Sequence, residues 1–148
     1  MDDLVDLLGK YGKSRRIFVT GHSLGGAIAT LITTRCHRYP ELPNPTLVTF
    51  GSPKVGNDAY VKYMNSLGVM HYRWVNNADV VARNPVLPSY AHHGKLVYFD
   101  HNGNIREMTD WQIRKDRIKG FFVGLMKGRV NFFVNHKIEN YVKNLERI

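Results

Sequence analysis

The segment Gly21–Gly25 reads GHSLG and places a serine between two glycines in the pattern G-x-S-x-G. A short apolar stretch, Arg15–Thr20, precedes it and is typical of a strand, and a 3.6-residue period that indicates a helix starts at Leu24. A serine at such a strand-to-helix turn sits in a strained bend that exposes its hydroxyl. The pattern predicts that Ser23 is a nucleophile, and the alternative is a plain helix N-cap.

The neighbours of this serine fit the same chemistry. Gly21 and Gly25 are expected to keep side chains away from the adjacent strand and helix, with His22 completing the bend. A helix N-terminus favours negative charge, so the backbone N–H of Leu24 is expected to donate to the oxyanion that forms during attack on a carbonyl.

A serine nucleophile needs a base, and the base needs a carboxylate that orients it. At this type of turn the chain order is serine, acid, histidine. Asp79 follows the strand predicted over 69–75 and has uncharged neighbours, as a partly buried carboxylate would. His136 lies just before the last amphipathic helix, which Asn135 is expected to cap. We predict Asp79 as the acid and His136 as the base; a turn aspartate and a surface histidine are the alternatives.

Other acids and histidines fit less well. Asp58 is better interpreted as part of a helix cap, and Asp100 as part of a tight turn. His22 precedes the acid in the chain, which argues against it as the base. His71 lies within a strand, and the pair His92–His93 has no evident third or fourth partner for zinc, so no metal site is expected. The single cysteine, Cys36, excludes an internal disulfide.

Strand and helix patterns alternate along the chain. Strands are predicted over 15–20, 46–50, 69–75 and 95–99, and helices over 4–11, from 24 to before Pro40, and over 58–67, 109–126 and 138–145. On the second helix, one face is shared by Leu24, Ala27, Ile28, Leu31 and Ile32. The alternation predicts a single α/β domain over 1–148, with a mostly parallel sheet of about four strands flanked by helices. Reactive groups gather at the carboxyl ends of such strands.

The net charge of +9 raises the question of an anionic partner. Much of the excess lies in 111–129, where basic residues alternate with apolar ones. This segment could dock on an anionic lipid surface or could simply be a solvated helix face. No motif of an RNA reader is visible, so nucleic acid is not expected as a partner. Neither a membrane-spanning run nor an N-terminal signal pattern is present, and the compartment is left open.

Several segments in chain order resemble the class 3 (fungal-type) lipase family of the α/β-hydrolase superfamily. They are VTGHSLGGA (19–27), TFGSPKVGN (49–57), VNNADVV (75–81), HG (93–94) and NHKIENY (135–141). The resemblance implies a triad of Ser23, Asp79 and His136, lipid-ester substrates and no metal cofactor. It leaves three functions open: a triacylglycerol lipase or carboxylesterase, a phospholipase A1 or galactolipase, and a non-catalytic lipase-like binding module. Members of the family are often secreted.

The chain also departs from that family. Asn135 stands where the family usually has Asp. The resemblance covers only the family's C-terminal half, so the early strands, the lid and the loop with the second oxyanion donor are expected to be missing, and activity is expected to be weak. The strand Arg16–Thr20 would then become an open edge. Such an edge would need a missing N-terminal segment, another partner or a second copy of the chain.

Overall fold

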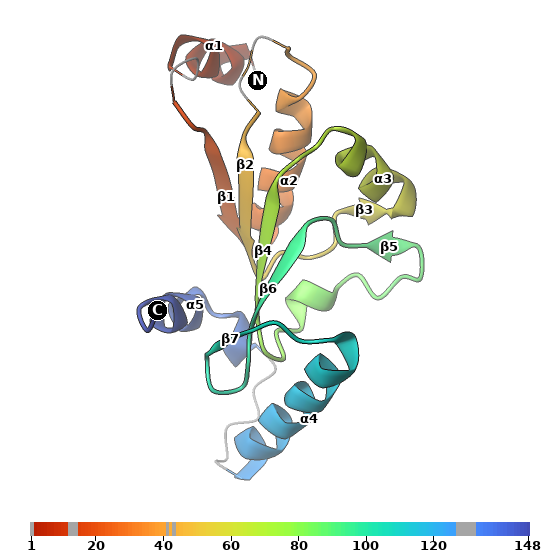
Figure 1. The fold of residues 1–148 in the computed structure, drawn as a ribbon, viewed down its shortest axis with the longest axis vertical. Helices are drawn as coiled ribbons and strands as arrows, with labels where there is room; N and C mark the ends of the chain where they lie inside the picture. The colour runs from red at the N-terminus through yellow and green to blue at the C-terminus, as the bar shows by residue number, and fades with distance from the viewer. Residues whose placement is uncertain (1, 12–14, 41, 43, 127–132) are drawn as a thin grey trace.

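The computed structural model describes residues 2–11, 15–40, 42, 44–126 and 133–148, and its core is a five-stranded sheet (Figure 1). The strand order is β1-β2-β4-β6-β7. Four strands pair in parallel, and β7 joins the edge antiparallel to β6. Their bounds are Phe18–His22 (β1), Thr46–Phe50 (β2), His71–Asn76 (β4), Lys95–Phe99 (β6) and Ile105–Arg106 (β7). The predicted parallel α/β sheet is confirmed.

Helices connect β1 to β2 and β2 to β4, as parallel neighbours require, and further helices precede β1 and follow β7. They are α1 (Asp2–Tyr11), α2 (Leu24–Cys36), α3 (Asp58–Ser66), α4 (Asp110–Met126) and α5 (Ile138–Leu145), with single 3-10 turns η1 (Val81–Arg83) and η2 (Val134–His136). A separate two-stranded ribbon pairs β3 (Gly56–Asn57) with β5 (Tyr90–Ala91). The sequence did not predict β3, β5 or β7, because two residues are too few to show an alternating pattern.

The two faces of the sheet are covered differently. One buried cluster joins Ala29 of α2, Leu47 of β2 and Met64 of α3. A second cluster joins Val75 of β4 to Ile113 of α4. Leu47 lies beside His71 in register, and Val75 is four residues further along β4, so both clusters lie on the same face. The opposite face is covered at its carboxyl end by α5, whose Tyr141 ring packs against Phe50 and Phe99.

Helix α2 buries its small and threonine side chains. Ala29 and Thr33 are 3% and 0% exposed, whereas Leu24, Ile28 and Leu31 are 68%, 49% and 52% exposed. The apolar face that the period marks is therefore not the face that packs on the sheet. A helix lying close against a strand needs small side chains, and Thr30 satisfies its buried hydroxyl by donating to the carbonyl of Gly26 at 2.9 Å.

Strand β1 lies at one edge of the sheet and pairs with β2 alone among the described strands. Its Phe18 side chain is 61% exposed. The predicted open edge is thus present, although β1 begins later and ends two residues further than the sequence indicated, so that His22 is its last residue. Within the described segments, no helix is long and apolar enough to cross a bilayer.

Candidate active site

The bend between β1 and α2 holds Ser23 in an unusual backbone conformation, with φ 56° and ψ −128°. A non-glycine residue with positive φ is strained and persists only where the surroundings fix it. Here the Ser23 N–H donates to the carbonyl of Phe50 at 3.0 Å, which ties the bend to the end of β2. The serine is the N-cap residue of α2, but its side chain makes no capping hydrogen bond. Its hydroxyl is therefore available for another partner.

The glycines around this bend have different roles. A Cβ on Gly21 would lie 2.2 Å from the carbonyl oxygen of Gly25, and one on Gly26 would lie 2.7 Å from the Cβ of Ser52. The prediction that Gly25 also avoids a collision is wrong, because a Cβ there would meet nothing within 4 Å. Gly21 of β1 lies against the backbone of the first turn of α2, and Gly26 lies against Ser52, which follows β2. Gly25 faces away from both contacts.

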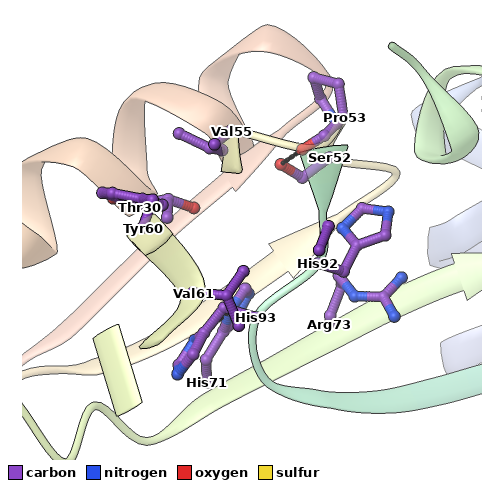
Figure 2. A pocket seen from close by; sticks show the side chains of 12 residues that line it. Thr30, Ser52, Pro53, Val55, Tyr60, Val61, His71, Arg73, His92 and His93 are labelled. Carbon is purple, nitrogen blue, oxygen red and sulfur yellow. Dashed lines mark hydrogen bonds between the residues drawn. The ribbon is translucent and has the colours of Figure 1, made fainter. Parts of the chain in front are cut away.

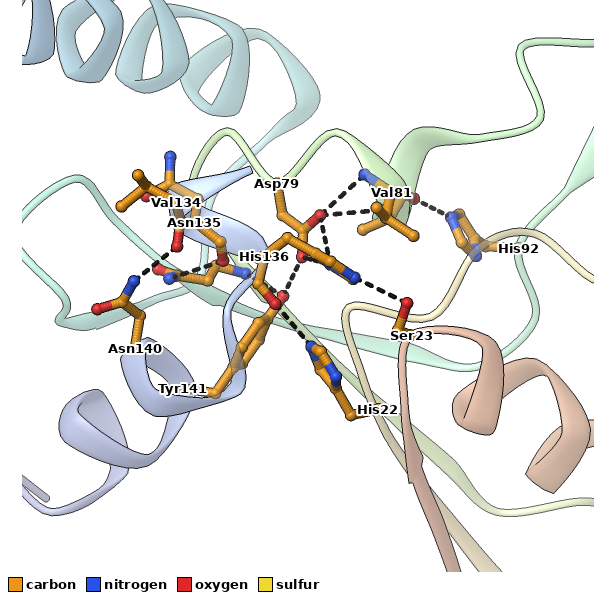
Figure 3. Close-up of polar contacts among 12 residues, drawn as sticks. His22, Ser23, Asp79, Val81, His92, Val134, Asn135, His136, Asn140 and Tyr141 are labelled. Atoms are coloured by element: carbon orange, nitrogen blue, oxygen red, sulfur yellow. Dashed lines mark hydrogen bonds and ion pairs between the residues drawn. The ribbon is translucent and has the colours of Figure 1, made fainter. Parts of the chain in front are cut away.

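Figure 3 shows three side chains from distant parts of the chain converging at the carboxyl end of the sheet. The Ser23 hydroxyl donates to Nε2 of His136 over 2.7 Å. Nδ1 of His136 lies 3.1 and 3.0 Å from the two carboxylate oxygens of Asp79. With Nδ1–H donating to Asp79, the other ring nitrogen carries the lone pair that faces the serine. This arrangement can remove the serine proton and stabilise the resulting imidazolium.

The Asp79 side chain is fully buried, at 0% exposure. Its Oδ1 accepts from the backbone N–H groups of Val81 and Ala82 at 2.9 and 3.3 Å. Its Oδ2 accepts from the hydroxyl of Tyr141 at 2.6 Å. Four donors, counting His136, therefore hold the carboxylate in one orientation, which is the condition for burying a charge without excessive cost.

Tyr141 was not predicted for the site, and His22 was predicted only as part of the bend. Tyr141 was assigned only to the apolar face of α5, but it is 0% exposed and bridges Asp79 to the backbone N–H of Asn76. Burial and the Asp79 charge raise the pKa of the Tyr141 hydroxyl, which stays protonated. His22 donates from Nε2 to the carbonyl of His136 at 2.6 Å and stacks on its ring at 4.6 Å. A polar group within an apolar helical stripe is the only sequence signal for Tyr141.

The segment that carries His136 is not built as predicted. Asn135 does not cap α5; the N-cap position belongs to Lys137, without a side-chain hydrogen bond. His136 ends the 3-10 turn η2, and the carbonyl of Asn135 accepts from Nδ2 of Asn76 at 3.1 Å. Contacts to the end of β4 therefore position the histidine, and Asn140 supports the turn by donating to the carbonyl of Val134 at 2.6 Å.

Gly51, directly after β2, lies beneath the histidine and the carboxylate. It has φ +56°, and a Cβ there would lie 2.7 Å from Oδ2 of Asp79 and 3.0 Å from Nδ1 of His136. Both the conformation and the available space therefore require glycine at this position.

The surroundings of Ser23 provide one oxyanion donor and an apolar hollow. The backbone N–H of Leu24 has no acceptor among the described residues, so it is free to bind an oxygen beside Ser23. An open hollow of about 770 Å³ starts at Leu24 and runs along the exposed face of α2 to the loop before β5. Its lining is mainly apolar and includes Ala27, Leu31, Pro85, Val86 and Leu87.

The other histidines lie away from this site. Nδ1 of His71 lies 3.3 Å from Nδ1 of His93, and Nε2 of His71 contacts the Thr49 hydroxyl at 2.9 Å. Nε2 of His92 donates to the carbonyl of Ala82 at 2.6 Å. All three surround a cavity of about 10 Å³, which has room for about one water molecule (Figure 2). The described part of the chain contains no group of three or more His, Cys, Asp or Glu side chains that could hold a metal ion.

The basic and apolar segment 111–129 is described only as far as Met126, so Lys127 and Arg129 lie outside the described residues. Helix α4 exposes large apolar side chains, including Trp111 (63%), Ile118 (58%) and Phe122 (56%). The ammonium group of Lys115 lies 3.5 Å from the centre of the Trp111 ring. Docking of this helix on a lipid surface stays a prediction.

The chain is similar to one known family and to several known proteins. The family described as Lipase (class 3) matches residues 1–88. Phospholipase A(1) DAD1 of Arabidopsis thaliana is 38% identical over 89 residues, which is 57% of this chain and 19% of that protein. A lipase of Rhizomucor miehei is 36% identical over 93 residues, which is 60% of this chain and 26% of that protein. The chain thus spans about a fifth to a quarter of the length of these relatives.

Solved structures agree with this similarity. A triacylglycerol lipase that is described as having a serine protease triad as its catalytic centre superposes with a TM-score of 0.62 and 34% identity. The match covers 70% of this chain and 41% of that lipase.

Proposed function

This chain belongs to the class 3 lipase family, and we propose on that premise that it hydrolyses lipid esters through an acyl-enzyme formed on Ser23. The relay of Ser23, His136 and Asp79, at 2.7 and 3.0 Å, is the observation that carries the proposal. The relatives include triacylglycerol and diacylglycerol lipases and phospholipases A1, all of which are ester hydrolases by name.

In the proposed mechanism, the Ser23 hydroxyl attacks the ester carbonyl while His136 takes its proton. The Asp79 carboxylate stabilises the imidazolium, and the N–H of Leu24 stabilises the oxyanion. His136 then gives the proton to the leaving alcohol, and the alcohol departs. A water molecule, deprotonated by the same histidine, attacks the acyl-enzyme and releases the fatty acid.

The apolar hollow beside Leu24 supports a lipid as the source of the ester. It begins at the residue after the nucleophile and is lined largely by aliphatic side chains, so an acyl chain extending from the carbonyl would lie in it. The exposed apolar face of α2 forms one wall of this hollow. We propose that the exposed apolar face of α2 binds the acyl chain of the ester.

A phospholipase A1 on the same relay is the second candidate, and it is supported by plant relatives of that name. Release of fatty acid from triacylglycerol and diacylglycerol emulsions, from phosphatidylcholine and phosphatidylglycerol vesicles and from galactolipid, measured side by side, separates the two functions. A headgroup preference of tenfold or more, about 1.4 kcal/mol in transition-state binding, assigns one of them.

The proposal is tested by turnover of a soluble p-nitrophenyl ester and by labelling with a fluorophosphonate probe. Ser23→Ala is expected to abolish labelling and to lower the rate by about 10⁴-fold or more. Ser66→Ala removes an exposed hydroxyl from the end of α3 and is expected to leave both readouts unchanged. Equal rates for the wild type and Ser23→Ala, or no labelling of folded wild type, would remove the enzyme proposal and favour a non-catalytic binding module.

A further inference from the structure

A second cluster of charged side chains lies between the sheet, η1 and α4, and it takes no part in the relay. It surrounds a pocket of about 280 Å³. Five permanently charged cations line the pocket, and Asp110 is its one acidic residue. The cations are Lys54, Arg73, Arg83, Arg114 and Arg117. His92 also lines it.

Arg73 is the most deeply placed of these cations. It projects from β4 on the face of the sheet that α4 covers, since Val75 lies two residues further along the strand on the same face. Its Nε is buried and has no hydrogen-bond partner, and no described carboxylate forms an ion pair with its guanidinium. Burial, assisted by the nearby Arg117, lowers its pKa to about 10. The residue is only partly buried, its enclosed Nε has no partner, and its charge is still present at neutral pH.

The hydrogen bonds of the neighbouring cations bring no negative charge close to Arg73. The Lys54 ammonium donates to the carbonyl of Pro85 at 3.3 Å, and Nε of Arg117 donates to the carbonyl of Asn77 at 3.3 Å. These acceptors are neutral. Burial, with the charges of Arg73 and Lys54 added, also lowers the pKa of His92 to about 3. The Arg73 guanidinium lies beside the His92 imidazole in Figure 2.

A partly buried guanidinium that lacks an ion-pair partner and stands among like charges is unfavourable unless an anion completes the site. We propose that this pocket binds the phosphate group of an anionic ligand, with the Arg73 guanidinium as its deepest donor and Arg114 and Arg117 closing over it from α4. Phosphate oxygens accept paired hydrogen bonds from arginine, and several cations offset the two negative charges of a phosphate monoester. About 10–15 Å³ suffices for one water molecule, so a 280 Å³ pocket holds a far larger group.

The phosphate can come from two sources, which offer the same group to these arginines. One is a phospholipid headgroup, since Lys54 lines both this pocket and the apolar hollow beside Ser23. The other is a soluble phosphate monoester. The proposal concerns binding and stands whether or not Ser23 turns over an ester.

The test measures binding of inorganic phosphate by calorimetry and by thermal unfolding in a buffer without other multivalent anions, with sodium chloride at equal ionic strength as the reference. Phosphate at ten times its dissociation constant is expected to raise the Tm of the wild type by about 3 °C. Arg73→Met is expected to remove this shift. Without phosphate, Arg73→Met is expected to be at least as stable as the wild type, because it removes an unpaired, partly buried charge.

Two further variants keep the result interpretable if Arg73→Met folds poorly. Arg114→Gln changes an exposed side chain of the same pocket and is expected to weaken phosphate binding about tenfold. Lys62→Gln makes the same charge change on an exposed residue of α3 and is expected to leave binding unchanged. A wild type that gains no more from phosphate than from chloride, or an Arg114→Gln that binds like Lys62→Gln, would overturn the proposal.

Vesicles separate the two sources. Co-sedimentation is measured with phosphatidylcholine vesicles that contain, or lack, phosphatidic acid. If the ligand is a headgroup, Arg114→Gln lowers binding to the phosphatidic acid vesicles alone. If it is a soluble phosphate, glycerol 3-phosphate competes with inorganic phosphate and the variant sediments like the wild type.

Discussion

Two charged side chains, partly buried Arg73 in β4 and fully buried Asp79 just after it, have opposite surroundings. The Asp79 carboxylate is fully enclosed and receives four hydrogen bonds from fixed donors. The Arg73 guanidinium has a buried Nε without an acceptor and stands among other cations. A charge whose partners are all internal serves to orient something, here His136. A buried charge without internal partners indicates that its partner comes from outside.

The sharpest way to break this comparison is Asp79→Asn. The amide keeps the shape of the carboxylate but neither stabilises the imidazolium nor holds the required tautomer, so kcat is expected to fall about 10⁴-fold in ester turnover. Asp58→Asn removes an exposed carboxylate at the start of α3 and serves as the control. If both variants retained wild-type rates, Asp79 would be a structural turn residue.

Acid unfolding tests the surroundings of Arg73, where histidines are held neutral by burial. Burial, with neighbouring cations adding, lowers the pKa values of His71 and His92 from 6.5 to about 3. Between those values the unfolded chain binds more protons, so stability is full above about pH 6.5 and falls as the pH drops toward 3. Each histidine contributes a slope of up to about 1.4 kcal/mol per pH unit. Urea denaturation at a series of pH values measures the slope.

His92→Gln isolates the contribution from the pocket. It is expected to reduce the slope between pH 6 and 4 by up to about 1.4 kcal/mol per unit, because it removes one of the histidines whose pKa burial lowers. A slope that stays at the wild-type value in this variant would mean that His92 is not held neutral beside Arg73.

A smaller effect is expected from Tyr141→Phe, which removes one of the four donors to Asp79 and the acceptor for the Asn76 N–H. Loss of a buried hydrogen bond to a charged group is expected to cost about 2 kcal/mol of unfolding free energy. The loosened carboxylate is expected to lower kcat about tenfold at unchanged KM. Unchanged kcat with reduced stability would limit Tyr141 to a packing role.

The sequence predicted most of the sheet, and it singled out Ser23, Asp79 and His136, which the fold brings together. The G-x-S-x-G bend and the strand before Asp79 are local patterns, and local patterns are what a single sequence displays. The family resemblance is confirmed by the match over residues 1–88. The apolar periodicity of α2 did not identify its buried face. Close contact with the sheet requires small side chains, so leucines such as Leu31 lie on the exposed side.

The supporting contacts were beyond the reach of pattern reading. His22 and Tyr141 meet His136 and Asp79 across separations of 114 and 62 residues. Asn135 looked like a helix cap, but Asn76 binds its backbone instead. Arg73 is unpaired because no carboxylate of the described residues forms an ion pair with it in the folded chain. No sequence pattern reports that kind of absence.

The lack of space around Gly51 has a consequence for assigning function to related sequences. Related chains can keep the serine, the aspartate and the histidine while losing turnover, and a survey of those three letters alone would count them as enzymes. A methyl group at position 51 would push into the carboxylate and the imidazole. Homologues with another residue at that position are therefore expected to have a displaced aspartate and histidine and to turn esters over more slowly.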